Sequence, residues 1–189
     1  MINIDKYENN IIKIILDFLK DEFIDNINVC PFIESPLIEL NERITLTELT
    51  NNICYINIPL YLSNNETVDF TTFFQNIDNK YNSAEIIKKY IKKKITKHTY
   101  KKIIRIHNVI PYSYIKLKLD FNTILILDYN GKKTIINDIP SIKKIINNLV
   151  PLTKMRFIFC IKKMWFEPYN RTNPEYSIAL CINKLELYL

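Results

Sequence analysis

The sequence predicts an α+β fold, because helical and strand-like hydrophobic patterns both occur in a chain that can bury a core. The 189 residues are 48% hydrophobic and 24% charged, as expected for one ordinary domain or for one domain with an extension. Helical spacing of apolar residues dominates the first part, whereas two-residue alternation dominates after Pro111. The uncharged apolar runs fall far short of the roughly 18 residues of a bilayer span, so no transmembrane helix is expected.

The first part of the chain predicts a helix, a strand and a polar loop. Apolar residues recur at helical intervals over Asp5–Asp25, which indicates an amphipathic helix with an acidic polar side. The run Ile53–Leu62 (ICYINIPLYL) is β-branched and aromatic, so we expect a strand that is interrupted at Pro59 or lies at an edge there. The polar stretch 64–82 is expected to loop, with at most a helical turn around Thr71–Ile77.

A strongly basic helix is expected over Ser83–Thr99. Isoleucines at i, i+4 and i+8 form its apolar stripe, and Ser83 is a suitable N-cap. Nine basic residues lie between Lys88 and Arg105, and Glu85 is the only acid between Ser83 and Asn108. Such a helix can be an ordinary solvated surface. Its uncompensated charge, however, is self-repulsive at i, i+4 unless a polyanion such as nucleic acid screens it.

After Pro111 the pattern predicts five strands with a short helix between the third and the fourth. The expected elements are strands Ser113–Leu119, Ile124–Leu127 and Lys132–Ile136, a helix over Pro140–Leu149, and strands Lys154–Phe166 and Tyr176–Leu187. A turn is expected at Asp120–Thr123, and Asn130–Gly131 is typical of a tight hairpin. This order is that of an OB-like five-stranded antiparallel barrel over about residues 111–189. A β-meander with a lateral helix has the same pattern and stays an alternative.

The strand motifs resemble those of a known protein family. The run Pro111–Thr123 (PYSYIKLKLDFNT), the strand Arg156–Trp165 (RFIFCIKKMW) and the closing Tyr176–Leu180 (YSIAL) look like the single-stranded DNA-binding proteins of poxviruses and other large DNA viruses. Ser177 departs from that pattern, which has a glycine after the tyrosine. The resemblance covers about residues 111–187 and implies sequence-independent coating of single strands in genome replication or repair, without catalysis.

Charge divides the chain into two parts. Residues 1–82 hold 5 basic and 13 acidic residues, whereas residues 83–189 hold 21 basic and 7 acidic residues. The 36 Ile, 23 Asn and 22 Lys indicate an AT-rich coding sequence, so the net charge of +6 can partly reflect codon usage. Codon usage acts on the whole chain alike and does not explain the difference in charge between the two parts. We therefore expect an acidic helical and mixed region over 1–82, and a basic helix plus barrel forming one compact unit over 83–189. The acidic region could contact replication proteins or a second copy of the chain.

Most catalytic and cofactor chemistry is disfavoured. A single glycine does not suffice for a P-loop or a dinucleotide fingerprint, and the cysteines lack CxxC spacing. The four thiols are expected to be reduced and buried. A metal-dependent nuclease built on Asp120, Asp128 and Asp138 is the weaker enzyme alternative, because two of these residues lie at turn positions. We expect no catalytic residues, no metal and no cofactor.

The predicted nucleic-acid-binding residues combine lysines and arginines with aromatic side chains. They are Lys88, Lys89, Lys92, Lys93, Lys97, Lys101, Lys102, Arg105, Tyr112, Tyr114, Lys116, Lys118, Arg156, Lys162, Trp165, Tyr169 and Arg171. Cations on a strand face bind phosphates, and aromatic rings stack on bases of any sequence. Lys116 and Lys118 could also be a plain solvated sheet face, and Trp165 could be a core residue.

The sequence thus predicts sequence-independent binding of single-stranded DNA, with RNA not distinguished. The alternative is a non-enzymatic virion or replication-complex subunit with a basic docking face. The N-terminus MINIDKYENN does not resemble a secretory signal, so an intracellular location is expected, at replication sites in the host cytoplasm or nucleus if the protein is viral. No membrane partner is expected.

Overall fold

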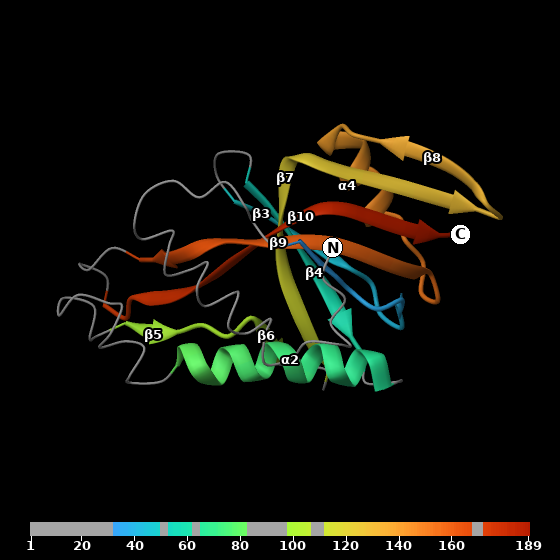
Figure 1. Cartoon of the computed structure of the whole chain (residues 1–189). Helices are drawn as coiled ribbons and strands as arrows, with labels where there is room; N and C mark the ends of the chain where they lie inside the picture. Colours follow the sequence, from blue (N-terminus) through green and yellow to red (C-terminus); the bar gives the residue numbers. More distant parts are fainter. Residues whose placement is uncertain (1–31, 50–52, 62–64, 83–97, 107–111, 168–171) are drawn as a thin grey trace.

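The computed structural model describes residues 32–49, 53–61, 65–82, 98–106, 112–167 and 172–189 (Figure 1). Its elements are β1 (Phe32–Glu34), β2 (Ile38–Glu39), β3 (Thr45–Leu49), β4 (Ile53–Leu60), α2 (Asn65–Tyr81), β5 (Thr99–Tyr100), β6 (Ile104–Ile106), β7 (Ser113–Tyr129), β8 (Lys132–Ile136), α4 (Ile139–Asn147), β9 (Lys154–Phe166) and β10 (Glu175–Tyr188). The predicted helix over Asp5–Asp25 and nearly all of the predicted basic helix lie outside the described residues.

The strands form one sheet with the order β1-β9-β10-β7-β4-β3. The short strands β2, β5, β6 and β8 pair with β9, β10, β7 and β7, respectively. β10 runs parallel to β7 and antiparallel to β9, and β4 runs antiparallel to β7. Both ends of this order, β1 and β3, come from the same segment, residues 32–49. The α+β prediction is therefore confirmed, with a sheet that accounts for most of the described chain.

The sheet is not confined to residues 111–189, as the sequence had led us to expect. β4 pairs with β7 over seven residues, so that Ile56 lies opposite Leu117 and Ile58 lies opposite Ile115. All four of these side chains are fully buried. The apolar face of β7 therefore obtains its neighbour from the first part of the chain, a long-range pairing that local periodicity does not reveal.

β7 is one continuous strand of 17 residues, whereas the sequence predicted two strands and a turn at Asp120–Thr123. Thr123 is fully buried, and its hydroxyl donates to the carbonyl of Ile182 in β10 at 2.9 Å. The amide of Asp120 in turn donates to the Thr123 hydroxyl at 3.0 Å. These bonds hold the polar stretch within the ladder, where the β10 register shifts between Ile182 and Lys184.

The hairpin, the short helix and the two long C-terminal strands are confirmed. Asn130 and Gly131 have φ of 51° and 85°, the positive values that a two-residue turn between β7 and β8 requires. α4 begins after Asp138, whose carboxylate accepts from the amide of Ser141 at 2.8 Å, and Pro140 lies in its first turn. β9 and β10 pair along nearly their full length.

The prediction of a polar loop over 64–82 is wrong, because α2 covers almost all of it. The apolar residues of this stretch recur at helical spacing and are buried: Phe70, Phe73, Phe74, Ile77 and Tyr81. Numerous Asn, Asp and Thr residues on the exposed side lower its mean hydropathy and hide this stripe. Figure 1 shows α2 along one side of the sheet, with α4 and the β7–β8 hairpin on the opposite side.

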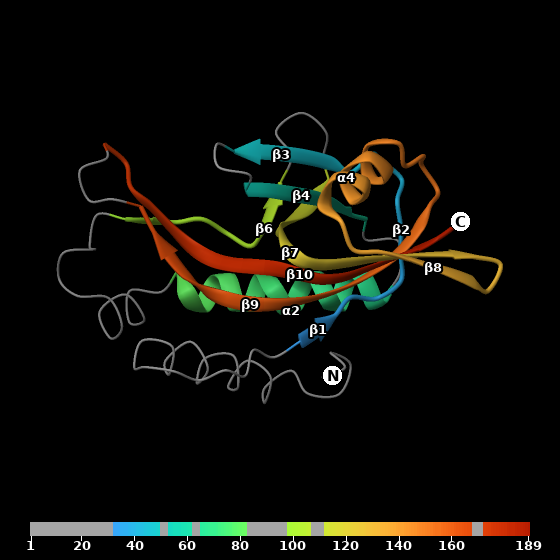
Figure 2. The same cartoon turned by 90° about the horizontal axis from the view of Figure 1, so that it is seen from above.

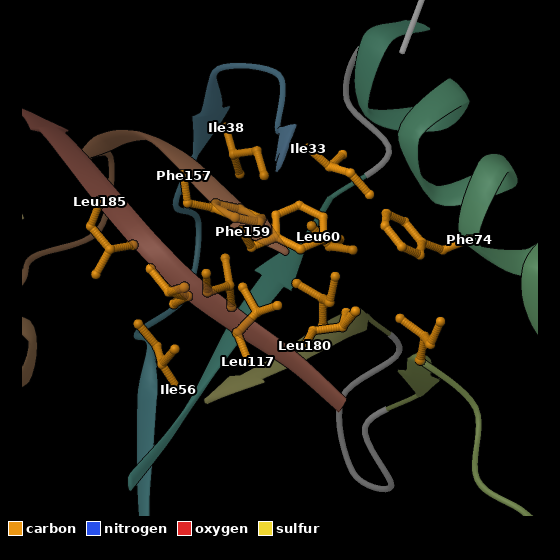
Figure 3. Close-up of a cluster of buried hydrophobic side chains, with 14 of the residues drawn as sticks. Ile33, Ile38, Ile56, Leu60, Phe74, Leu117, Phe157, Phe159, Leu180 and Leu185 are labelled. Atoms are coloured by element: carbon orange, nitrogen blue, oxygen red, sulfur yellow. The ribbon is translucent and has the colours of Figure 1, made fainter. Parts of the chain in front are cut away.

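The core lies between α2 and the sheet. Phe157 and Phe159 of β9 are fully buried, and Phe70 of α2 meets both rings edge-on with centroid distances of 6.0 and 6.2 Å. Figure 3 shows Phe74 pointing from α2 toward Phe159, and their centroids are 5.7 Å apart. Aromatic contacts across this layer fix α2 on the sheet. Figure 2 shows from above that α2 runs along β9 and β10.

Of the helices that the structure describes, neither combines the length and the apolar character that a bilayer span needs. Within the same residues, no group of three or more His, Cys, Asp or Glu side chains is placed to hold a metal ion.

Candidate nucleic-acid interface

The side of β3, β4 and β7 that points away from the core carries polar and aromatic side chains, and we call it the outer face. Along β7, buried Ile115, Leu117 and Leu119 alternate with half-buried residues of the other side. The outer face consists of Thr45 and Thr47 of β3, Tyr55 and Asn57 of β4, Tyr114, Lys116 and Lys118 of β7, and Tyr61 and Tyr112, which adjoin β4 and β7.

The strand register places lysines next to aromatic and amide side chains. Lys118 is opposite Tyr55, and Lys116 is opposite Asn57. The ammonium of Lys116 also lies over the Tyr55 ring, 4.5 Å from its centroid. Such a contact directs the lysine across the strand toward the ring. Lysine and tyrosine thus share one compact area of β4 and β7.

Two tyrosines extend this area beyond the paired residues. Tyr61 follows β4 and Tyr112 precedes β7, and their rings are stacked with centroids 5.7 Å apart and an interplanar angle of 28°. Both rings remain partly exposed. A pair of partly exposed, stacked rings offers a π surface on which an unpaired base can stack.

Asn57 is held in place by the threonines of β3. Its side-chain amide donates to the hydroxyl of Thr45 at 2.9 Å and to that of Thr47 at 3.3 Å. Thr45, Asn57, Tyr112 and Tyr114 also line a hollow of about 180 Å³ on this face. Cross-strand hydrogen bonds within the protein therefore hold these polar side chains of the outer face in place.

The segment 98–106 borders the outer face and is tied to α2 through Asp78. This buried carboxylate accepts from the Tyr100 hydroxyl at 2.8 Å and from the amides of Ile103 and Ile104 at 2.7 and 3.1 Å. Burial raises the pKa of Asp78, while these three donors act in the opposite direction. The anchored β6 then pairs with β7, so that Arg105 lies opposite Tyr114.

Beyond β6, the same side of the sheet carries Lys101 and Trp165. Tyr176 of β10 points into the core, so its neighbour Ser177 and the paired residue Trp165 of β9 belong to the other side. The Ser177 hydroxyl donates to the carbonyl of Lys101 at 2.5 Å. Trp165 is half-buried. Its exposure is therefore intermediate between that of a core residue and that of an exposed ring on which a base could stack.

A group of cations sets the electrostatics of this side. Within the described residues, Lys102, Arg105, Lys116 and Lys118 form no salt bridge. Burial lowers the pKa of Lys116, and the positive charges of Arg105 and Lys101 lower it further. An anion at this position would relieve the repulsion among these cations.

Other predicted cations are partly or fully neutralised. Lys101 binds Glu175 at 2.5 Å, and Lys162 lies 3.9 Å from Asp120. Arg156 lies 3.5 Å from Glu34. In the sheet, Arg156 is paired with Glu186 of β10, and Glu186 is paired with Ile126 of β7. Ile126 is ten residues from Lys116 along β7, which corresponds to about 30 Å at the usual strand rise. The structure therefore does not bring Arg156 to the outer face, and its part in nucleic-acid binding stays a prediction.

The structure places the remaining predicted residues as follows. The outer face and its border hold Lys101, Lys102, Arg105, Tyr112, Tyr114, Lys116, Lys118, Lys162 and Trp165. Outside the described residues lie Lys88, Lys89, Lys92, Lys93, Lys97, Tyr169 and Arg171. Sequence reasoning missed Thr45, Thr47, Tyr55, Asn57 and Tyr61. The alternation in Ile53–Leu62 already put Tyr55 and Asn57 on one strand side, but not beside β7.

Comparison with solved structures shows a similar fold in a known protein. The crystal structure of gp2.5, a single-stranded DNA-binding protein encoded by bacteriophage T7, is similar with a TM-score of 0.50. The alignment covers 85% of this chain and 87% of that chain at 10% sequence identity, so the likeness concerns the fold alone. It agrees with an OB-like fold. The predicted five-stranded antiparallel barrel over about residues 111–189 is wrong in two respects, because β10 runs parallel to β7 and because β1 to β4 belong to the same sheet. No family model and no curated protein matches the sequence, and the resemblance to the poxvirus proteins stays a prediction.

Proposed function

We propose that the protein binds single-stranded DNA without sequence preference, during genome replication or repair, through the outer face. The observation that carries this proposal is a group of cations, Arg105, Lys116 and Lys118, that lie among tyrosines and have no carboxylate partner in the described part of the chain. Cations bind the phosphates of a strand whatever its bases, and tyrosine rings stack on any base.

The fold likeness supports the same function. The similar T7 protein is described as a single-stranded DNA-binding protein. An exposed face of a curved sheet with aromatic and basic side chains is also how OB-folds accept oligonucleotides. A non-catalytic role is consistent with this likeness, because base stacking and phosphate binding need no reacting group.

Salt-dependent binding of oligo-dT tests the proposal. We expect log K to fall with log salt by about 0.7 for each phosphate that a lysine or arginine neutralises. Lys116→Gln/Lys118→Gln should weaken binding and reduce that slope by about 1.4. Lys132→Gln/Lys144→Gln is the matched control, because it removes the same charge from two exposed lysines of β8 and α4.

The control variant should bind oligo-dT like the wild type. Equal losses in both double variants would show a nonspecific charge effect and contradict the assignment of the outer face. The emission of Trp165, the single tryptophan, provides a second readout. If the strand crosses to β9, oligo-dT quenches this emission, and Trp165→Ala costs about 1 to 3 kcal/mol of binding. Absence of any binding to oligo-dT would leave the docking-subunit alternative.

A further inference from the structure

A second, larger hollow lies beside the outer face, between α2 and β6. Its volume is about 460 Å³, within the roughly 300 to 1,000 Å³ of pockets that hold small ligands. Its lining residues are Gln75, Asp78, Asn79, Lys102, Ile104, Arg105, Ile106 and Ser113. It is separate from the small hollow over Asn57, and the proposed function does not use it.

The polar groups around this hollow are of two kinds. Lys102 and Arg105 come from the segment that Asp78 anchors, and neither forms a salt bridge within the described residues. The Nε of Arg105 donates to the carbonyl of Lys102 at 3.2 Å, which leaves the two terminal nitrogens of the guanidinium for a ligand. Gln75 and Asn79, one helical turn apart on α2, contribute uncharged amides.

Asp78 is part of the lining, and its negative charge opposes an anionic ligand, but the charge of Lys102 acts against it and its oxygens are already occupied. Its two carboxylate oxygens already accept three hydrogen bonds, from Tyr100, Ile103 and Ile104. The side chain is also buried. The groups that remain for a ligand are therefore two cations and two amides, which match a phosphate and the hydrogen-bonding edge of a base.

The hollow shares one residue, Arg105, with the border of the outer face. Arg105 lies opposite Tyr114 in the β6–β7 pairing, and it also lines the hollow. Ser113, another lining residue, is the first residue of β7. A strand that follows the cations from Lys116 to Arg105 would reach a residue that lines the hollow.

We propose that this hollow receives one nucleotide of the bound strand, with Lys102 and Arg105 at its phosphate and the amides of Gln75 and Asn79 at its base. This inference rests on the proposed function and adds a base-contacting subsite to it. Polar contacts of amides to a base edge would give the protein a modest base preference at one position of an otherwise sequence-independent path.

The test uses the full chain and a 15-residue oligo-dT. Gln75→Ala/Asn79→Ala should weaken binding about three- to tenfold and leave the salt slope unchanged, because no cation is lost. Thr72→Ala/Asn76→Ala is the matched control, since it removes two exposed polar side chains at the same spacing on α2, outside the hollow. Its affinity should equal that of the wild type.

The side-chain amide signals of Gln75 and Asn79 in NMR spectra give a direct readout. Titration with thymidine 5′-monophosphate should shift both signals, and Lys102→Gln/Arg105→Gln should abolish the shifts. Equal affinities of the two α2 double variants, with unmoved amide signals, would overturn the inference. If Lys116→Gln/Lys118→Gln still weakens oligo-dT binding in that case, the proposed function stands; if the wild type does not bind oligo-dT, both fail.

Discussion

At the scale of single residues, Lys116 links the electrostatics of the free protein to its proposed activity. It contacts the Tyr55 ring and lies near other cations, and burial together with the charges of Arg105 and Lys101 lowers its pKa below the ordinary 10.5. A lowered pKa means that the charged form is disfavoured without an anion. A phosphate would favour the charged form, so binding and protonation of this residue are coupled.

This coupling predicts a pH dependence. Affinity for oligo-dT should be full where free Lys116 is already protonated, below its lowered pKa, and should fall as pH rises through that value. Lys116→Arg keeps the charge because arginine stays protonated at these pH values, so its affinity should fall less than that of the wild type over the same window. Affinity measurements between pH 8 and about 10.5, at constant ionic strength, check this. An identical fall in the wild type and in Lys116→Arg would contradict the role of Lys116.

At the scale of elements, α2 and the β5–β6 segment depend on each other. α2 packs Phe70 and Phe74 on the sheet, and its Asp78 accepts the three hydrogen bonds that hold segment 98–106. That segment in turn supplies Arg105 to the border of the outer face. One buried carboxylate thus connects the core layer to the proposed interface.

We expect Asp78→Ala to lower the free energy of unfolding by about 2 to 5 kcal/mol, because it leaves the Tyr100 hydroxyl and two amides without an acceptor. Asp69→Ala, at an exposed position of the same helix, should change it by less than about 0.5 kcal/mol. Urea unfolding measures both values. Equal stability of the two variants would show that Asp78 does not anchor the segment.

At the scale of the whole molecule, the sheet joins the acidic and basic parts of the chain. β4 is the hydrogen-bonded neighbour of β7, and β1 and β2 pair with β9. Residues 1–82, expected from their charge to form a region of their own, therefore supply strands and α2 to the same core as residues 83–189. Charge asymmetry along the chain does not mark a structural boundary here.

A fragment of residues 83–189 is accordingly expected not to fold by itself. It lacks β1 to β4 and α2, so the apolar side of β7 and the rings of Phe157 and Phe159 would lose their buried contacts. Circular dichroism during heating should show no cooperative transition, in contrast to the full chain. A fragment with a sharp thermal transition would show that the second part is an independent domain.

The sequence by itself determined the elements whose signals are local. The Asn130–Gly131 turn requires positive φ, Asp138 and Pro140 begin α4, and the alternation around Lys116 puts lysines and tyrosines on one side of β7. These features depend on residues within a few positions of one another, so backbone sterics and periodicity suffice to predict them. The fold class followed from the same signals.

Only the tertiary structure decided which strands are neighbours and which charges remain unpaired. Tyr55 and Lys118 are 63 positions apart, and Arg156 is neutralised by Glu34, far away in the sequence. Strand pairing and ion pairing depend on which apolar faces are buried together, and this is a property of the whole chain rather than of any window of it. Tertiary packing also explains why α2 is a helix. Its contacts with β9 outweigh the weak helix propensity of its many Asn, Asp and Thr residues.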